Sequence, residues 1–331
     1  VDEQGFSEGV KAQIIKAVPP TRRVAKDTVI CLDLKTGKTL WRAEAPGKPI
    51  GRNCSSTPVV AHGKVFAMGS TCLYCVNAEN GDIIWSIPFK SAALGSSPMV
   101  VNDLLVVNMG VLTAYDIDTG KERWSNKSAR MSNSSPALWS KGDTTLIIAN
   151  ARSTIGAYDP ATGATVWEVP GGGDSTPAIH GDILAVQSRN EKLGLIAVQL
   201  DVKEPKTLWT FPFEARRTQA SPVIDQNRVY LIDNSKGYCL DLASGKKIWE
   251  QAIQAAITSP VLVDNKLYLI TDRGNNLTMY KLSKSELTEL GKTRIQALWC
   301  PSPSVADGYI VVRKADRFVC YDLRDGAAGN N

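Results

Sequence analysis

Short apolar runs alternate with turn residues, and this alternation repeats along nearly the whole chain. In each unit a small polar residue and a proline open an apolar run. A second run follows, and a third ends in an aspartate, a Thr-Gly turn and a tryptophan. The clearest third run extends from Leu112 through Asp116 and Gly120 to Trp124. Apolar runs this short, bounded by turn residues and without helical periodicity, predict β-strands.

The aspartate position recurs about every 41 residues, which marks a structural repeat. We place its eight copies at Asp33, Asn77, Asp116, Asp159, Asp201, Asp241, Leu282 and Asp322. In six copies a tryptophan follows eight residues later. We expect these tryptophans to dock one repeat on the next: Trp41, Trp85, Trp124, Trp167, Trp209 and Trp249. The seventh copy has Leu290 in that place.

A second landmark keeps step with the first, because a serine or threonine precedes a proline in seven repeats. The pairs are Thr57-Pro58, Ser97-Pro98, Ser135-Pro136, Thr176-Pro177, Ser221-Pro222, Ser259-Pro260 and Ser302-Pro303. Proline is tolerated at the first residue of a strand. Each unit therefore reads as four short strands, and many such units predict an all-β fold, a β-propeller.

The segment from Ala114 to Trp124 resembles the tryptophan-docking repeat of the pyrroloquinoline-quinone-like propellers, and the resemblance covers residues 28–326. We expect one domain over residues 1–331 with eight four-stranded blades. Residues 1–27 would supply strands of the first blade, and the N- and C-terminal strands would pair to close the ring. The alternative is seven blades, with residues 38–42 closing the last one.

The resemblance implies two kinds of function. The family includes quinoprotein alcohol dehydrogenases, which hold pyrroloquinoline quinone with calcium. It also includes a non-enzymatic lipoprotein of the outer-membrane β-barrel assembly machinery. This chain has no adjacent cysteine pair and almost no insertions between repeats. We therefore expect a non-catalytic scaffold with no catalytic residue, cofactor or metal. The alternative is a quinone- and calcium-dependent dehydrogenase acting on an alcohol or sugar.

Charge adds one candidate site to this picture. The chain carries 38 basic and 33 acidic residues, and its composition is that of a soluble globular protein. Sorted by predicted loop, fifteen basic and six acidic residues fall on the rim formed by the fourth-to-first and second-to-third strand connections. A net charge this mild does not indicate nucleic acid. We expect a monomer whose basic rim binds a protein or an anionic ligand.

Three arginines occupy one repeat position, six residues before the proline: Arg52, Arg130 and Arg216. Guanidinium groups suit carboxylates and phosphates. We add Arg217, Arg294 and Trp299 as candidate contacts on the same rim. The alternative is that these charges are only solvated loop residues.

The cysteines and histidines give no metal or redox motif. Cys31, Cys75, Cys239 and Cys320 precede the aspartate position by two residues, where other copies have alanine, so we interpret them as small buried hydrophobes. A Cys54–Cys72 disulfide stays open, and His62 and His180 fall in predicted surface turns. The resemblance implies export to the periplasm or cell envelope, although residues 1–20 show no signal peptide. A removed signal peptide or lipid anchor also stays open.

Overall fold

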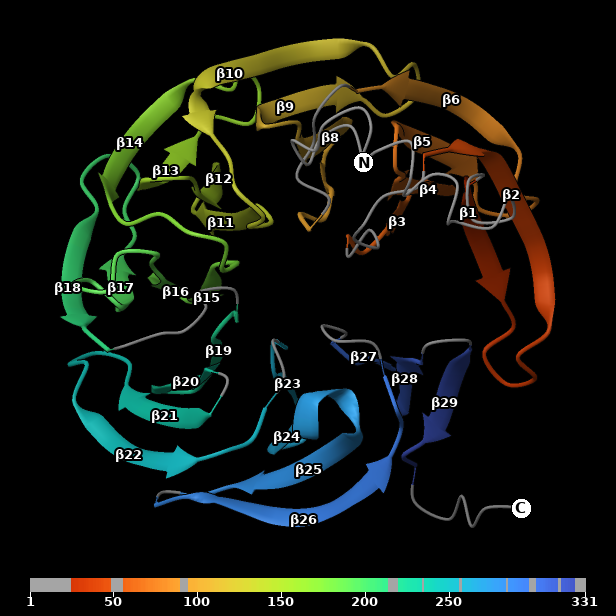
Figure 1. Ribbon diagram of the computed structural model, residues 1–331. Coiled ribbons are helices and arrows are strands. Elements are labelled where there is room, and N and C mark those ends of the chain that lie inside the picture. Colours follow the sequence, from red (N-terminus) through yellow and green to blue (C-terminus); the bar gives the residue numbers. More distant parts are fainter. Residues whose placement is uncertain are drawn as a thin grey trace, which may run out of the picture. The chain divides into compact units, whose positions relative to one another are not determined.

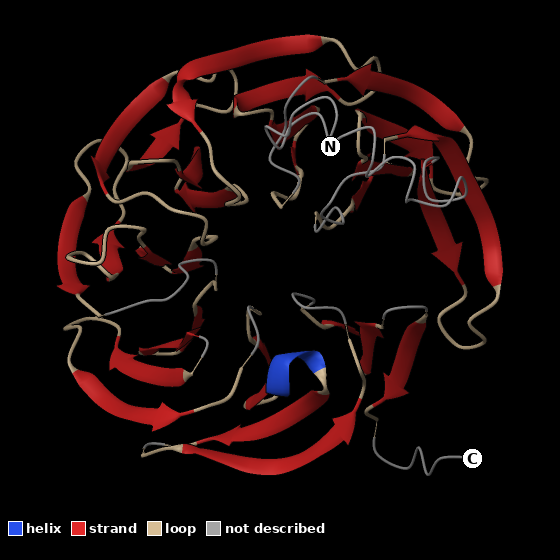
Figure 2. Ribbon diagram, in the orientation of Figure 1, coloured by secondary structure: helices blue, strands red, loops and turns tan. Residues whose placement is uncertain are grey.

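A computed structural model shows that the chain is built of short antiparallel strands (Figures 1 and 2). It describes residues 25–48, 56–89, 95–213, 220–233, 235–255, 258–283, 285–297, 302–314 and 317–324. Among these, the only helical segment is a single 3-10 turn, η3 (Asp272–Gly274). The chain divides into two compact units, residues 1–90 and 91–331, which are described separately.

The described residues of unit 1 form two sheets. β1 (Ala25–Leu32) and β2 (Thr39–Gly47) form a two-stranded sheet. The second is a four-stranded sheet of β3 (Val59–Ala61), β4 (Lys64–Met68), β5 (Cys72–Asn77) and β6 (Ile83–Pro88).

The residues of unit 2 that the structure describes form six sheets, and strands that are neighbours along the chain are neighbours within each sheet. The first strands are β7 (Met99–Val101), β11 (Ala137–Lys141), β15 (Ala178–His180), β19 (Val223–Asp225), β23 (Val261–Val263) and β27 (Ser304–Ala306). The second are β8 (Leu104–Asn108), β12 (Thr144–Asn150), β16 (Ile183–Gln187), β20 (Arg228–Asp233), β24 (Lys266–Thr271) and β28 (Tyr309–Arg313).

The third strands are β9 (Val111–Asp116), β13 (Thr154–Tyr158), β17 (Leu195–Gln199), β21 (Lys236–Asp241), β25 (Asn276–Leu282) and β29 (Phe318–Asp322). The fourth are β10 (Glu122–Arg130), β14 (Thr165–Pro170), β18 (Lys206–Phe211), β22 (Lys247–Ala252) and β26 (Leu287–Arg294). Each first strand begins one residue after its proline, so the proline directly precedes the strand that we expected it to open. The fold is that of an all-β propeller, with these sheets as its blades.

The expectation of eight four-stranded blades is wrong, because the described residues form seven blades. Six have four strands, and the last, β27–β29, has three. The first copy of the motif, which ends at Trp41, folds instead as the two-stranded sheet β1–β2. We counted copies of the third-strand motif, and a copy without the two strands before it does not make a blade. Residues 1–24, which we expected to provide closing strands, lie outside the described residues.

Two copies of the motif are shifted from their predicted positions. The pairing of β17 with β18 places Gln199, not Asp201, opposite the start of the second strand. In the next irregular copy, Lys281 and Gly291 occupy the places we gave to Leu282 and Leu290. In both sheets the turn before the fourth strand is two residues longer than in the others, which a search at fixed spacing cannot detect.

The core of unit 2 lies between neighbouring sheets. One apolar cluster joins Val106, Leu112 and Trp124 of the sheet β7–β10 to Ile147 and Tyr158 of the sheet β11–β14. Burying these side chains contributes about 1.5–3 kcal/mol each. Cys239 is fully buried in a similar cluster, and Cys75 is fully buried in unit 1. Cys31 is only half-buried and Cys320 is exposed, because each lies in an incomplete sheet, where fewer strands cover it.

Tryptophans of the fourth strands attach each sheet to the next. The indole Nε1 of Trp124 donates to the Pro160 carbonyl at 2.8 Å, that of Trp167 to Asp201 at 2.9 Å and that of Trp209 to Leu242 at 2.8 Å. In unit 1, Trp41 donates to Ala78 in the same manner. Trp249 differs, because its buried Nε1 has no acceptor among the described residues.

The seam beyond Trp249 uses other groups. The carbonyl of Ser283, which corresponds to the acceptors of the other indoles, instead accepts from Nη1 of Arg228 at 3.4 Å. The side-chain amide of Gln251 bonds both ways with the backbone of Leu287, at 3.0 and 2.9 Å. This amide therefore links β22 to β26 where the indole does not.

The Thr-Gly turn that receives the indole is shaped by its aspartate and glycine. Asp241 accepts the backbone N–H and the hydroxyl of Ser244 at 2.8 and 2.7 Å, and Asp116 does the same for Thr119. Gly163 has φ +70°, and a Cβ there would overlap the ring of Trp124. Glycine is therefore needed both for the left-handed backbone and for the close approach of the indole.

A hydrogen-bonded row also joins the inner edges of the sheets of unit 2. The backbone N–H before each proline donates to the hydroxyl of the corresponding serine or threonine in the next sheet. The bonds are Ser97 to Ser135, Ser135 to Thr176, Thr176 to Ser221, Ser221 to Ser259 and Ser259 to Ser302, at 2.9 to 3.2 Å. The Ser/Thr-Pro motif thus fixes the spacing of the first strands.

Gly163→Ala tests the docking of Trp124. We expect a loss of about 2–4 kcal/mol in the free energy of unfolding, since the left-handed residue and the displaced indole each cost about 1–2 kcal/mol. Gly142→Ala is the matched control, because Gly142 also has a positive φ but an added Cβ would meet nothing within 4 Å. Urea denaturation measures both, and equal losses would contradict the docking role.

Asp241→Asn tests the charge in the turn. Hydrogen bonds from the Ser244 hydroxyl and N–H lower the pKa of Asp241. Its stabilisation is therefore complete above the unfolded pKa of about 3.9 and is lost as the pH falls through the folded value. The free energy of unfolding should fall less steeply from about pH 5 to 3 in the variant than in the parent. Asp143→Asn, at an exposed turn, should leave the slope unchanged, and equal slopes in all three would refute the role.

Candidate functional site

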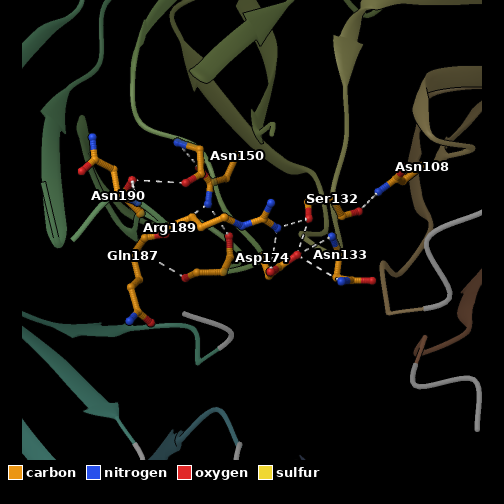
Figure 3. A network of polar contacts seen from close by, with 11 residues as sticks. Asn108, Ser132, Asn133, Asn150, Asp174, Gln187, Arg189 and Asn190 are labelled. Atoms are coloured by element: carbon orange, nitrogen blue, oxygen red, sulfur yellow. Dashed lines mark hydrogen bonds and ion pairs between the residues drawn. The ribbon is translucent and has the colours of Figure 1, made fainter. Parts of the chain in front are cut away.

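A polar network lies where β8, β12 and β16 end, on the predicted basic rim (Figure 3). At its centre the carboxylate of Asp174 accepts hydrogen bonds from the Ser132 hydroxyl, from the backbone N–H of Asn133 at 3.1 Å and from the Asn133 side chain at 3.0 Å. Nη2 of Arg189 donates to the same carboxylate at 2.9 Å and to the Ser132 hydroxyl at 2.8 Å. These bonds join the β10–β11 connection, the β14–β15 connection and the β16–β17 loop of unit 2.

Asp174 is held in its charged form. Burial alone would raise the pKa of this carboxyl, but the hydrogen bonds from Ser132 and Asn133 and the pairing with Arg189 outweigh it and lower the pKa. The Asp174 side chain is only 10% exposed, whereas that of Arg189 is 46% exposed. The charge of Arg189 is thus compensated, and this pair serves as an anchor for the loops.

Three amide side chains at one repeat position lie next to the network, and two of them bond to the connections that carry it. Asn108, Asn150 and Gln187 end successive second strands and are buried. Asn108 donates to the Ser132 carbonyl, and Asn150 donates to the Ser175 carbonyl at 2.9 Å. These amides hold the neighbouring connections in place. We did not predict them, although their shared position at the end of a strand was readable from the repeat.

Gln187 departs from this pattern. Its side chain is fully buried, and neither its amide nitrogen nor its oxygen has a hydrogen-bond partner among the described residues. Asn150 bonds to Ser175, which lies in the connection from its own sheet to the next one. The corresponding connection for Gln187 joins β18 to β19, and residues 214–219 of that connection lie outside the described residues.

Two arginines stand beside the network without a compensating acid. Arg130 ends β10, and the backbone N–H of Arg152 donates to the Arg130 carbonyl at 2.8 Å, so the two residues are neighbours across sheets. Both are exposed. In the part of the chain that the structure describes, neither forms an ion pair. Arg152 holds the same repeat position as Arg189, one sheet earlier.

The other predicted rim residues have different outcomes. Arg294 ends β26 and is exposed, with no ion pair to any described residue. Arg52, Arg216, Arg217 and Trp299 lie outside the described residues, as does Cys54 of the considered disulfide. Lys236, counted among the basic rim residues, pairs with Glu250 at 2.7 Å. The rim is therefore less basic than a count of loop charges suggests, and Arg130, Arg152 and Arg294 are among its residues without an ion pair to a described residue.

The described residues do not fit a quinone–calcium centre. No group of three or more histidine, cysteine or acidic side chains gathers among them. Calcium takes six to eight oxygen ligands. Asp174 is already neutralised by Arg189, and burial raises the pKa of Asp233, the buried carboxyl that ends β20, to about 6. His62 and His180 are exposed at turns of different units. No described helix has the length and apolarity that crossing a membrane requires.

Known proteins place this chain in a family. The family model described as outer membrane protein assembly factor BamB matches residues 25–214 and 169–289. The BamB of Shewanella oneidensis is 26% identical over 69% of this chain and 63% of its own length. Tetrathionate hydrolase of Acidithiobacillus ferrooxidans is 26% identical over 72% of this chain but 44% of its own length. The chain thus spans less than two thirds of each of these relatives.

The solved structures agree on the fold. The crystal structure of BamB from Moraxella catarrhalis superposes with a TM-score of 0.68, at 17% sequence identity over 86% of this chain and 85% of that one. The match of the family model extends over more than half of the chain and includes the repeats that build the network described above. The chain therefore belongs to the family of the outer membrane protein assembly factor BamB.

Proposed function

We propose that this protein is a non-catalytic propeller scaffold that acts in the cell envelope, in the assembly of outer membrane proteins, by binding an acidic segment of a partner protein. The observation that carries the proposal is the pair Arg130 and Arg152, which are exposed neighbours without an ion pair among the described residues. The family supplies the process, since its relatives are described as assembly factors of outer membrane proteins.

The chemistry of the pair favours a carboxylate partner. A guanidinium group presents a planar fork of donors that matches a carboxylate, and the resulting charge-assisted bonds are about twice as strong as neutral ones. The loops beneath are fixed by Asp174, Arg189 and Asn150. A site whose loops are already ordered loses less conformational entropy on binding. We extend the proposal to Arg294, and to Arg52, Arg216, Arg217 and Trp299 as further contacts.

The proposed scaffold function includes export, a monomeric state and the absence of a cofactor. The low share of insertions supports it, because the quinoprotein resemblance implies catalytic residues in long insertions. The described residues also offer no calcium-binding group.

The double variant Arg130→Gln/Arg152→Gln tests the rim. We expect binding of an acidic partner to weaken about 30–1,000-fold, since each of the two charge-assisted bonds contributes roughly 1–2 kcal/mol. The measurement is titration with a labelled polyglutamate peptide, followed by pull-down of outer membrane assembly proteins from an envelope extract. Added salt should weaken the parent more than the variant.

The matched control removes two positive charges elsewhere. Lys121→Gln/Lys206→Gln changes two exposed lysines, one directly before β10 and one at the start of β18, that form no ion pair with a described residue, whereas Arg130 ends its strand. This variant should bind as the parent does. Undiminished binding by the Arg130/Arg152 variant, or an equal loss in the control, would refute the rim as the binding site.

The absence of a cofactor is tested with pyrroloquinoline quinone and calcium. We expect no bound chromophore in the absorbance spectrum after gel filtration and no dye-linked oxidation of alcohols or sugars. A stoichiometric chromophore with turnover would instead assign a dehydrogenase activity.

A further inference from the structure

A polar cleft of about 190 Å³ opens between the sheets β19–β22 and β23–β26 of unit 2. One side is the end of β22 and the residues after it, and the other is formed by β24, β25, β26 and η3. At about 30 Å³ for each water, the cleft holds roughly six water molecules. It lies away from Arg130, Arg152 and the Asp174 network, none of which lines it.

The cleft exists because two large side chains of the previous seam are missing here. Between the sheets β15–β18 and β19–β22, Tyr238 packs against Phe211 and Phe213, with ring centroids 5.7 and 5.3 Å away. The pairing of strands places Thr278 at the position of Tyr238. Ile253 follows Trp249 as Phe213 follows Trp209. Smaller side chains at both positions leave space that an apolar core would fill.

The groups left around this space are polar. Thr271 and Thr278 are buried and their hydroxyls bond each other at 2.7 Å, which leaves one proton of the pair available for another acceptor. Asp272, Glu289 and Lys292 line the cleft, and Nζ of Lys292 lies 3.6 Å from Oε1 of Glu289. The lining therefore has a net charge of −1, which disfavours an anionic ligand.

Tyr280 is the second and independent sign of a ligand. It lines the cleft, is only 8% exposed, and its hydroxyl has no hydrogen-bond partner among the described residues. Burial, together with the nearby charges of Glu289 and Asp272, raises the pKa of Tyr280 and keeps the phenol protonated as a donor. The hydroxyl keeps contact with the solvent of the cleft, and a bound ligand would replace water as its hydrogen-bond partner.

We propose that this cleft binds a small uncharged polyhydroxylated ligand, a single sugar ring. Such a ligand both donates and accepts hydrogen bonds at every hydroxyl. The lining complements this: the carboxylates of Asp272 and Glu289 accept, the ammonium of Lys292 donates, and the hydroxyls of Tyr280 and Thr278 do both. The volume lies below the roughly 300–1,000 Å³ of sites for drug-sized ligands, so one ring and not an oligosaccharide fits.

The test uses D-glucose and N-acetyl-D-glucosamine as probes, with inorganic phosphate as the charged comparison. Ligand-observed NMR titration of the full chain should show saturable binding of at least one sugar and none of phosphate. Tyr280→Phe should weaken that binding about 5–10-fold while the urea midpoint stays at or above that of the parent. Thr278→Tyr, which restores the residue of the previous seam, should abolish it.

Tyr115→Phe is the matched control, because Tyr115 has the same repeat position in β9 and does not line the cleft. It should bind sugar as the parent does. Should Thr278→Tyr fail to fold, Glu289→Gln at the mouth of the cleft replaces it, with a several-fold loss expected. The proposal is overturned by the absence of saturable binding of both sugars, by unchanged binding in Tyr280→Phe, or by competition from phosphate.

Discussion

The contact of an indole ring with a glycine turn in the next sheet is the interaction on which the fold depends. No single sheet of four short strands can bury both of its faces, so its stability comes from its neighbour. The indole supplies a large apolar area and one donor, and Trp124 and Trp209 use both. The aspartate that shapes the turn and the glycine that admits the ring are both needed to form the receiving surface.

The inner edge of unit 2 is fixed by a different and weaker set of bonds. There a backbone N–H meets the hydroxyl of the next sheet, as from Thr176 to Ser221. The proline that follows has no backbone N–H, so the serine or threonine before it has the one backbone N–H of the motif that needs an acceptor. Because the connections that carry Ser132 and Asp174 end at this edge, the network around Asp174 is supported from it. Arg130 and Arg152 are thus carried on a framework that exists before any partner arrives.

Much of the fold was predictable from sequence, because Trp and Ser/Thr-Pro at near-constant spacing are sufficient to identify the strands. The number of blades was not, since the motif containing Asp33 and Trp41 looks complete yet has no first and second strand among the described residues. The shifted copies at Gln199 and Gly291 were missed because longer turns break fixed spacing. For the site, charge identified Arg130 but not the pairing of Arg189 with Asp174, which depends on which loops meet. The buried amides of Asn108 and Asn150 carry no charge signal at all.

The unpaired indole of Trp249 has a consequence for the motions of the molecule. In proteins built from stacked repeats, stability is close to a sum over neighbouring interfaces, and local opening starts at the weakest of them. The seam after Trp249 lacks the indole bond that Trp124, Trp167 and Trp209 make, and it also contains the polar cleft. Amide hydrogens of β22 and β25 should therefore exchange with solvent sooner than those of β14 and β17. A molecule bound in that cleft would bridge the two sheets and slow amide exchange on both sides of the seam at once.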